Sequence, residues 1–342
     1  MKRVLLILMI ASALFIFIGC EADQIMQSKG NESYVCDLVW GIKGTGNSEF
    51  KTPTALAVDD AGNVYVCDTG NKRIQVFNSE GSYQYEFGSS FDAPAPAPDG
   101  LQRPMGIAIS ANGHVWVSDN DPGNLPSTTE AEACNRIVEF GTDGTYIASY
   151  GTYGTFGSPG GFFDQPHGLT FDGNGILYVC DRLNNRLQTY DPVTQIWTLH
   201  GSQGFEPGKF TNPKDVAVDS VGNILVADTE GFRIQKLDSG WNPITQYGSV
   251  GVPGEGDDMF NEPSAIDVDS NDFVYVLDTY NFRVMKFDQN LNYVCKFGAP
   301  EGVGASSAFG ALNVGFGLAV NADGKVYVSD AVTIRLNRYV HS

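Results

Sequence analysis

The amino-acid sequence predicts an all-β fold, a six-bladed β-propeller of four-stranded antiparallel blades. Three observations support this prediction. A segment of about fifty residues recurs six times along the chain, and such a period is typical of propeller blades. Apolar residues alternate with polar ones within each copy, as they do in strands. The last copy lacks a fourth strand, and a matching strand stands near the N-terminus.

The start of the chain has the features of an export signal. Lys2 and Arg3 precede an apolar run, Val4 to Ile18, which is too short for a typical membrane-spanning helix. The run ends in Phe-Ile-Gly-Cys, which resembles a bacterial lipobox. This resemblance implies that residues 1–19 are a lipoprotein signal peptide, that Cys20 carries acyl chains such as palmitate, and that residues 20–32 form a polar tether. An ordinary signal peptide with a coincidental cysteine is the alternative.

Charge and cysteine content narrow the function classes. The formal net charge is −19, and such a surface repels phosphate backbones, so we expect no nucleic-acid partner. Five cysteines follow Cys20. An odd number in an exported chain leaves at least one thiol free or paired with another molecule. No CxxC pair occurs, so the sequence offers no zinc-ribbon or thioredoxin-type motif.

The repeat is easiest to see in its central hairpin. The stretch VYVCDTGNKRIQVF (64–77) aligns with LYVCDRLNNRLQTY (177–190), ILVADTEGFRIQKL (224–237), VYVLDTYNFRVMKF (274–287) and VYVSDAVTIRLNRY (326–339). A sixth copy is split by an insertion between Asp119 and Arg136. Each copy has an aspartate at the end of one predicted strand and an arginine at the start of the next. The pairs are Asp68 and Arg73, Asp119 and Arg136, Asp181 and Arg186, Asp228 and Arg233, Asp278 and Arg283, and Asp330 and Arg335.

Two further strands flank this hairpin in each copy. Upstream, a proline precedes an apolar alternation, as in PTALAVD from Pro53 and PHGLTFD from Pro166. Turns rich in Asn, Asp and Gly separate this strand from the next one. Downstream, a strand ends in an aromatic residue and glycine, as in Phe87-Gly88. Each copy therefore predicts four short strands.

The whole pattern resembles the NHL repeat family, whose members are propellers. The resemblance covers residues 33–342 and rests on positions that recur in register six times. The N-terminal stretch SYVCDLVWG (33–41) matches NYVCKFG (292–298), so we expect it to supply the missing strand of the last blade. Closure of this kind leaves no open sheet edge between the termini.

The recurring Asp and Arg are predicted to be structural. A carboxylate at the end of one strand and a guanidinium at the start of the next can brace the turn between them. A single active site does not need six copies. Positions that differ between blades are the better candidates for a binding site.

Two variable slots lie on the same predicted face of the disc. The residues after the proline slot are Thr54, Met105, His167, Lys214, Ser264 and Phe316. The residue after the anchor Asp is Arg182 in the third copy and uncharged in the others. His167, Arg182 and Lys214 thus predict a local site for an anionic group such as a carboxylate. The alternative is that these residues pair with nearby acids, Asp215 for Lys214 and Asp164 or Asp172 for the others.

The PHG form around His167 also resembles two groups of propeller lyases, those that cleave peptidyl-hydroxyglycine and those that open cyclic peptide lactones. A catalytic zinc needs about three protein ligands, and the equivalent slots hold Thr, Met, Lys, Ser and Phe. A three-histidine zinc site is therefore not predicted, and no residue is assigned as catalytic. His167 remains a candidate general base.

An acidic loop, PGEGDDMFNEP (253–263), offers Glu255, Asp257 and Asp258 as weak calcium candidates. No EF-hand spacing is present, so a solvated acidic loop is the alternative, and no cofactor is predicted.

Together these features favour a monomeric, lipid-anchored, extracytoplasmic scaffold that binds a protein, peptide or glycan. The anchor would hold it to a bacterial membrane, either the outer membrane facing the periplasm or the cell surface. A lyase or hydrolase that uses His167 at the channel mouth is the alternative, and the sequence favours an enzyme less than a binding protein.

Overall fold

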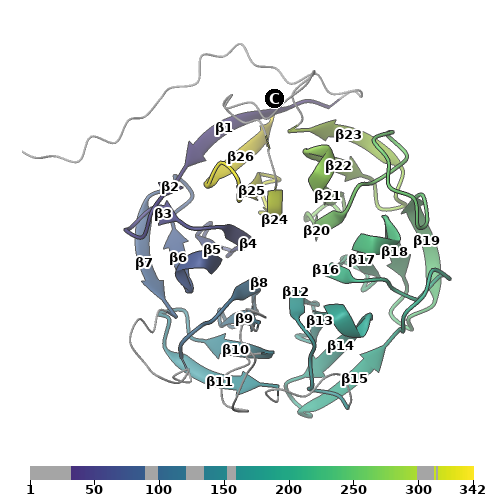
Figure 1. The fold of residues 1–342 in the computed structure, drawn as a ribbon, viewed down its shortest axis with the longest axis horizontal. Coiled ribbons are helices and arrows are strands. Elements are labelled where there is room, and N and C mark those ends of the chain that lie inside the picture. Colours follow the sequence, from purple (N-terminus) through teal and green to yellow (C-terminus); the bar gives the residue numbers. More distant parts are fainter. Residues whose placement is uncertain (1–31, 89–98, 121–134, 152–158, 299–311, 313–314) are drawn as a thin grey trace, which may run out of the picture.

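The computed structural model describes residues 32–88, 99–120, 135–151, 159–298, 312 and 315–342. Six four-stranded antiparallel sheets are arranged around a central axis (Figure 1). The predicted six-bladed propeller is therefore confirmed. Cys20 lies outside the described residues, as do most of the predicted tether and the insertion after Asn120. No helix within the described ranges is long and apolar enough to cross a membrane.

The first three blades follow the predicted strand order from the axis outward. They are β4 (Pro53–Val58), β5 (Val64–Asp68), β6 (Arg73–Phe77) and β7 (Tyr83–Phe87); β8 (Pro104–Ile109), β9 (Val115–Asp119), β10 (Arg136–Phe140) and β11 (Tyr146–Tyr150); and β12 (Pro166–Phe171), β13 (Leu177–Asp181), β14 (Arg186–Asp191) and β15 (Ile196–His200).

The remaining blades follow the same order, and the last takes its outer strand from the N-terminus. They are β16 (Pro213–Val218), β17 (Ile224–Asp228), β18 (Arg233–Leu237) and β19 (Pro243–Gly248); β20 (Pro263–Val268), β21 (Val274–Asp278), β22 (Arg283–Phe287) and β23 (Tyr293–Phe297); and β24 (Gly315–Val320), β25 (Val326–Asp330), β26 (Arg335–His341) and β1 (Tyr34–Trp40). Short additions are the pair β2 (Ile42–Lys43) and β3 (Glu49–Phe50) and the 3-10 turns η1 (Thr69–Asn71), η2 (Arg182–Asn184), η3 (Thr229–Gly231) and η4 (Thr279–Asn281).

The ring closes as the sequence predicted. Strand β1 pairs antiparallel with β26, from Tyr34 opposite His341 to Trp40 opposite Leu336. The Tyr34 hydroxyl lies 2.9 Å from that of Tyr275 in the neighbouring blade. Glu32 forms an ion pair of 2.5 Å with Lys286. The N-terminal strand is therefore held by its own blade and by the adjacent one.

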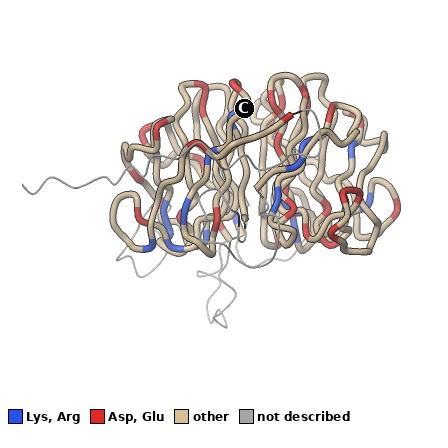
Figure 2. The backbone as a smooth tube through the Cα atoms, turned by 90° about the horizontal axis from the view of Figure 1, so that it is seen from above, with Lys and Arg blue, Asp and Glu red and all other residues tan. Residues whose placement is uncertain are grey.

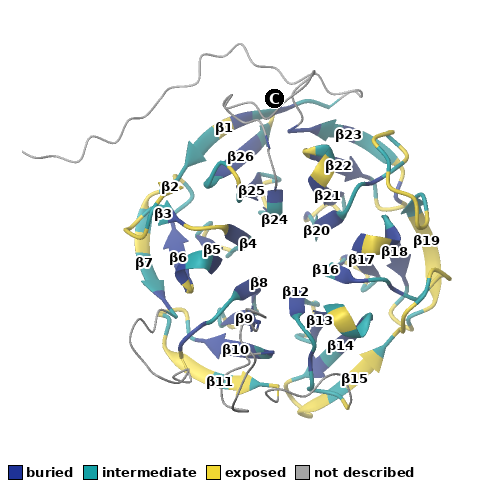
Figure 3. Cartoon of the chain, in the orientation of Figure 1, coloured by how far each residue is buried: buried dark blue, intermediate teal, exposed yellow. Residues whose placement is uncertain are grey.

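The core lies between blades, because both faces of each central strand are covered. Val64 and Val66 of β5 pack toward the last blade, whereas Tyr65 and Cys67 pack toward the second blade. The alternation with period two therefore distributes one strand between two apolar layers. Figure 3 shows the resulting burial of the inner and central strands, whereas the outer strands β11, β15 and β19 are largely exposed and β1, β7 and β23 are mostly intermediate.

Cys67, Cys180 and Cys295 are buried free thiols, and Cys36 is buried as well. Burial raises the pKa of the Cys67 and Cys180 thiols well above the usual range and that of Cys295 to about 12. These thiols are therefore protonated at neutral pH and unreactive. Cys134 lies outside the described residues.

Five of the six hairpins between a second and a third strand are closed by a buried Asp–Arg ion pair. The Asp–Arg distances are 2.8 Å for Asp68 and Arg73, 3.1 Å for Asp119 and Arg136, 2.7 Å for Asp181 and Arg186, and 2.8 Å both for Asp228 and Arg233 and for Asp278 and Arg283. In the last blade Asp330 and Arg335 are register partners.

The other carboxylate oxygen accepts a hydrogen bond from a backbone N–H in the loop that precedes the proline-slot strand of the same blade. In the fourth blade this bond runs from the Thr211 N–H to Asp228 at 2.6 Å. A glutamine two residues after the arginine adds a third contact in three blades. In the fourth blade Gln235 donates to both Asp228 and the Lys209 carbonyl. Sequence comparison had identified the Asp and Arg of this brace but not the glutamine.

The strand order gives the disc two distinct faces. The face called here the loop face carries the connections that lead into each proline slot and the turns after each anchor Asp. The turn face carries the tight turns between first and second strands and between third and fourth strands. Figure 2 views the disc edge-on, with the C-terminus at the upper rim, which is the turn face.

The fully buried Arg233 provides a test of the brace. Arg233→Ala leaves Asp228 buried without its ion pair and frees the carbonyls of Phe205, Glu206 and Lys209. We expect a loss of about 3–5 kcal/mol in the free energy of unfolding, measured by urea denaturation. Lys209→Ala removes an exposed pair with Glu206 and should cost less than about 1 kcal/mol. Equal effects of the two substitutions would contradict a structural role for the brace.

Candidate ligand site at the channel mouth

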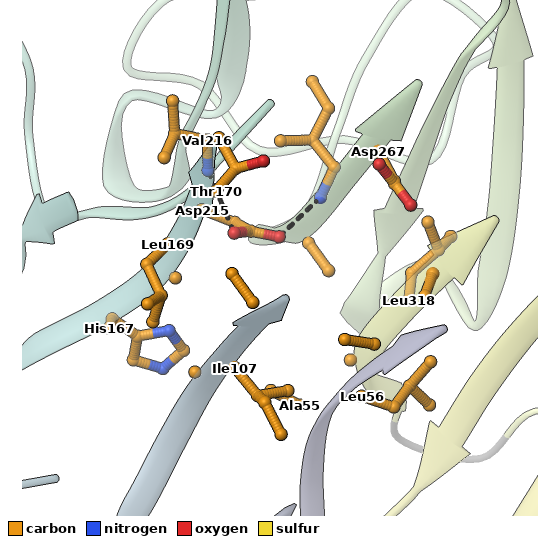
Figure 4. Close-up of a pocket in the computed structure, with 18 of the residues that line it drawn as sticks. Ala55, Leu56, Ile107, His167, Leu169, Thr170, Asp215, Val216, Asp267 and Leu318 are labelled. Carbon is orange, nitrogen blue, oxygen red and sulfur yellow. Dashed lines mark hydrogen bonds between the residues drawn. The ribbon is translucent and has the colours of Figure 1, made fainter. Parts of the chain in front are cut away.

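The six proline-slot strands β4, β8, β12, β16, β20 and β24 surround a central cavity of about 230 Å³ (Figure 4). These strands are the inner edges of their sheets, so part of their backbone N–H groups face the axis without a ladder partner. The cavity is therefore narrow and lined partly by backbone.

Small side chains occupy most of the inward positions. The second residue after the proline slot is Ala55, Gly106, Gly168, Asp215, Ala265 and Gly317 in the six blades, and the fourth is Ala57, Ala108, Thr170, Ala217, Asp267 and Ala319. Asp215 and Asp267 are the exceptions. Close approach explains the small residues, because a Cβ on Gly168 would stand 2.7 Å from the Cα of Asp215.

The two aspartates bridge neighbouring blades. Asp215 accepts the N–H of Ile266 at 2.9 Å, and Asp267 accepts the N–H of Val320 at 2.7 Å. Figure 4 marks the first of these bonds with a dashed line. Burial raises the pKa of Asp215 to about 8 and that of Asp267 to about 6. Both residues therefore satisfy backbone donors at the axis while carrying less negative charge than exposed aspartates.

His167 lies in the wall of the cavity and is 7% exposed. Its Nδ1–H donates to the Lys214 carbonyl of the next blade at 2.9 Å, which leaves Nε2 as a lone-pair acceptor. No described residue contacts Nε2 by a hydrogen bond. Burial, followed by the charges of Lys214 and Arg182, lowers the pKa of His167 to about 3. The imidazole is therefore neutral at pH 7.

Arg182 and Lys214 lie at the loop-face end of the same two blades. Arg182 donates through Nε to Asn212 and through Nη1 to Gln165 at 3.0 Å. Lys214 pairs with Glu262 at 3.2 Å. The alternative prediction that Lys214 pairs with Asp215 was wrong, because the Asp215 carboxylate accepts hydrogen bonds from the backbone N–H groups of Val216 and Ile266. Burial is the largest cause that lowers the pKa of both cations.

The other predicted slot residues divide into two groups. Met105, Ser264 and Phe316 line the cavity together with His167. Thr54 instead bonds to Thr69 at 2.6 Å and to the Pro104 carbonyl at 3.2 Å. Thr54 therefore joins the first two blades and does not line the cavity.

Arg103 was not predicted by the sequence comparison. It stands immediately before the proline slot of the second blade, in the position held by Gln165, Asn212 and Glu262 in the following blades. Its charge is close enough to lower the pKa of both His167 and Arg182. A comparison of the position before the proline would have singled it out, since the other blades carry Thr, Gln, Asn, Glu and Val there.

The predicted calcium candidates lie on the loop before β20. The Asp257 carboxylate contacts Lys296 at 2.5 Å and Arg283 at 3.5 Å, and the Glu255 carbonyl accepts from Arg283. Within the described part of the chain, no three His, Cys, Asp or Glu side chains are grouped to hold a metal ion. The arrangement therefore gives no support to a calcium or zinc site.

Comparison with known proteins identifies the family of the repeat. The family model described as "NHL repeat" matches residues 50–77, 163–190, 210–237 and 260–287. The chain contains NHL repeats. NHL repeat-containing protein 3 of Mus musculus is 30% identical over 207 residues, which cover 56% of this chain and 54% of that protein. The chain thus spans about half the length of this relative.

Solved structures share the fold at low identity. A streptogramin B lyase has a TM-score of 0.58 and 14% identity, with 90% of this chain and 98% of that chain covered. An auxiliary nutrient binding protein from Bacteroides thetaiotaomicron has a TM-score of 0.63 and 13% identity, with 91% and 83% covered. One fold therefore carries both a lyase and a binding protein, and it does not decide between them.

The low pKa of His167 predicts a pH dependence of stability. The unfolded histidine titrates near 6.5 and the folded one near 3, so the unfolded state binds more protons as the pH falls through this window. Stability contributed by the neutral ring is complete above pH 6.5 and is lost progressively below it. His167→Gln cannot titrate, and it should lose about 3 kcal/mol less than the wild type between pH 7 and pH 4.

Urea denaturation at the two pH values measures this difference. His341→Gln, at an exposed position, is the matched control and should follow the wild type. Identical pH dependence in the wild type and His167→Gln would show that the folded imidazole is not held neutral.

Proposed function

We propose that this NHL propeller is a lipid-anchored, extracytoplasmic binding protein that receives a protein, peptide or glycan on its loop face. The main support is the uneven distribution of exposed large apolar side chains. On the loop face they are Ile42, Leu183, Phe205, Val250, Val252, Tyr280, Phe282 and Val332, whereas the turns of the opposite face expose Val193 and Val221. The others lie on the outer strands β11, β15 and β19 at the rim of the disc and are Tyr146, Ile147, Ile196, Leu199 and Ile244. Exposed apolar groups gathered on one face are typical of an interaction surface.

The position of the N-terminal strand supports the same orientation. Ser33 bonds to Ser342 at the turn face, where β1 begins and β26 ends. A lipid on Cys20 would therefore attach the disc from the turn-face side. The turns there are acidic and carry Asp59, Asp60, Glu80, Asp143, Asp172, Asp191, Asp219, Asp238, Asp269, Asp272, Asp288 and Asp323. The loop face would then point away from the membrane and be open to ligands.

Binding is favoured over catalysis by the chemistry of His167. A general base works best when its pKa lies near the working pH, and burial puts the pKa of His167 at about 3. A neutral imidazole of this kind is a hydrogen-bond acceptor but a weak base.

A lyase or hydrolase is the second candidate. The observation in its favour is the fixed tautomer of His167, whose Nδ1–H donates to Lys214 and whose Nε2 carries the lone pair beside the cavity. An anionic substrate would raise the pKa of the ring and strengthen it as a base. Turnover abolished by His167→Ala but retained in Thr54→Ala would establish the enzyme and overturn the scaffold.

The anchor is tested by cell fractionation. Cys20→Ser should move the protein from the membrane fraction to the soluble fraction, because acyl chains on that thiol would supply the membrane affinity. Cys134→Ser, a cysteine outside the lipobox, should leave the distribution unchanged. Membrane retention of Cys20→Ser would exclude lipidation at this residue as the anchor.

The binding face is tested by placing a charge in the apolar surface. Phe205→Glu and Tyr280→Glu change side chains that are 51% and 49% exposed on the loop face, and Val221→Glu changes one that is 76% exposed on the turn face. Peptide and glycan arrays identify ligands of the wild type. We expect the loop-face variants to lose about tenfold or more in affinity, which corresponds to roughly 1.4 kcal/mol. Loss caused by Val221→Glu alone would place the binding surface on the opposite face.

A further inference from the structure

We propose that the channel mouth over the second to fourth blades recognises the free carboxylate of a peptide C-terminus with an apolar last side chain. The inference rests on the proposed binding function and names the ligand group that the mouth would accept. It is carried by the charge balance of Arg103, Arg182 and Lys214 and by the free acceptor of His167.

The strands that carry these residues are in direct contact. A Cβ on Gly106 in β8 would stand 2.1 Å from the His167 carbonyl in β12, and the His167 ring bonds to the Lys214 carbonyl in β16. Arg103 immediately precedes β8. The guanidinium of Arg182 joins Gln165, just before β12, to Asn212, just before β16. Arg103, His167 and Arg182 are therefore presented by adjoining blades at one sector of the mouth.

The two guanidinium groups of this sector have no direct contact with a described carboxylate. Lys214 has an ion pair with Glu262. Arg182 bonds instead to two side-chain amide oxygens, which are neutral acceptors. Among the described residues, none forms a hydrogen bond or ion pair with the Arg103 guanidinium. Neither guanidinium therefore forms a direct ion pair with a described carboxylate, although the charges of Glu230, Glu262 and Asp164 act to raise the pKa of Arg182. Planar guanidinium groups match carboxylates by two parallel hydrogen bonds.

His167 also requires that the ligand carry a hydrogen-bond donor close to its carboxylate. Its Nε2 can only accept a hydrogen bond from the ligand, because Nδ1 is already the donor to the Lys214 carbonyl. A C-terminal residue has both groups, a carboxylate and the N–H of its own amide. Its side chain would meet the apolar part of the cavity lining, which includes Met105, Ile107 and Leu169.

This apolar part of the lining favours a peptide over an acidic sugar, whose hydroxyl groups would find no hydrogen-bond partner on Met105, Ile107 or Leu169. Asp215 and Asp267 lie further along the same cavity and would oppose deeper entry of an anion when ionised. The ligand carboxylate is therefore expected to stay with the arginines at the mouth.

The experiment compares two fluorescein-labelled hexapeptides of one sequence ending in leucine, one with a free C-terminal acid and one with a C-terminal amide. Fluorescence anisotropy with the full chain should show the acid binding about tenfold or more tightly than the amide, because charge-assisted bonds to arginine are strong. Arg103→Gln and Arg182→Gln should remove this preference. Lys209→Gln, an exposed loop-face lysine, is the control and should retain it. Circular dichroism melts verify that the variants fold.

Every other result overturns the inference. Equal affinities for acid and amide, or no binding of either peptide, would exclude C-terminal carboxylate recognition. A galacturonic acid trisaccharide that binds in an Arg182-dependent way while the peptides do not would assign the mouth to acidic sugars. These outcomes differ from a failure of the proposed function. The proposed function would fail if ligands found on the arrays bound Phe205→Glu and Tyr280→Glu as tightly as the wild type.

Discussion

The buried Asp–Arg pair that closes the central hairpin of five blades is the interaction on which the rest of the molecule depends. The aspartate ends the second strand, the arginine starts the third, and the pair is cut off from water, as at Asp228 and Arg233. Such a pair gains little net free energy over an apolar substitute, but loss of one partner is costly. The arginine also satisfies loop carbonyls, and the aspartate satisfies a loop N–H. The brace therefore determines where the loop before each inner strand lies.

This constraint creates the site. Because the loop before each proline slot is held by the brace of the same blade, the residues next to the proline project at equivalent places around the mouth. Thr52, Gln165, Asn212 and Glu262 all have φ between 52° and 57° at the position before the proline. Arg103 does not share this left-handed conformation, although it occupies the same slot. Four described blades thus share a strained backbone conformation at this position, and the second blade, which carries Arg103 there, lacks it.

The sequence was sufficient for the architecture because every blade repeats the same local signals. Alternation in β5, the turn after Asp59 and the pairing of Asp68 with Arg73 depend on residues close together in the chain. The closure by β1 could also be predicted, since residues 33–41 match an outer strand of another copy. The alternation of apolar and polar residues and the turn residues therefore predict the same strands in each copy.

The contacts of the site could not be predicted in the same way, because they join different blades. His167 finds its acceptor 47 residues away at Lys214, and Lys214 finds its partner 48 residues away at Glu262. Pairing of Lys214 with Asp215, its neighbour in sequence, was the alternative to a ligand role. Adjacent residues of a strand point to opposite sides, and the unpaired backbone N–H of Ile266 lies beside Asp215. These partners are decided by how the inner strands of neighbouring blades lie against each other. No local sequence pattern predicts that alignment.

The same geometry explains why the mouth is asymmetric in a nearly symmetric disc. The repeat imposes one backbone on all blades, so differences in function must come from side chains at equivalent slots. Cations occupy these slots in the second to fourth blades, whereas exposed aromatic residues such as Phe205 and Tyr280 lie over the fourth and fifth. Burial keeps His167 neutral, so it does not add to the repulsion between Arg103 and Arg182. A neutral acceptor near two guanidinium groups is therefore stable in the absence of ligand, and an anion that also brings an N–H or O–H donor would suit all three side chains.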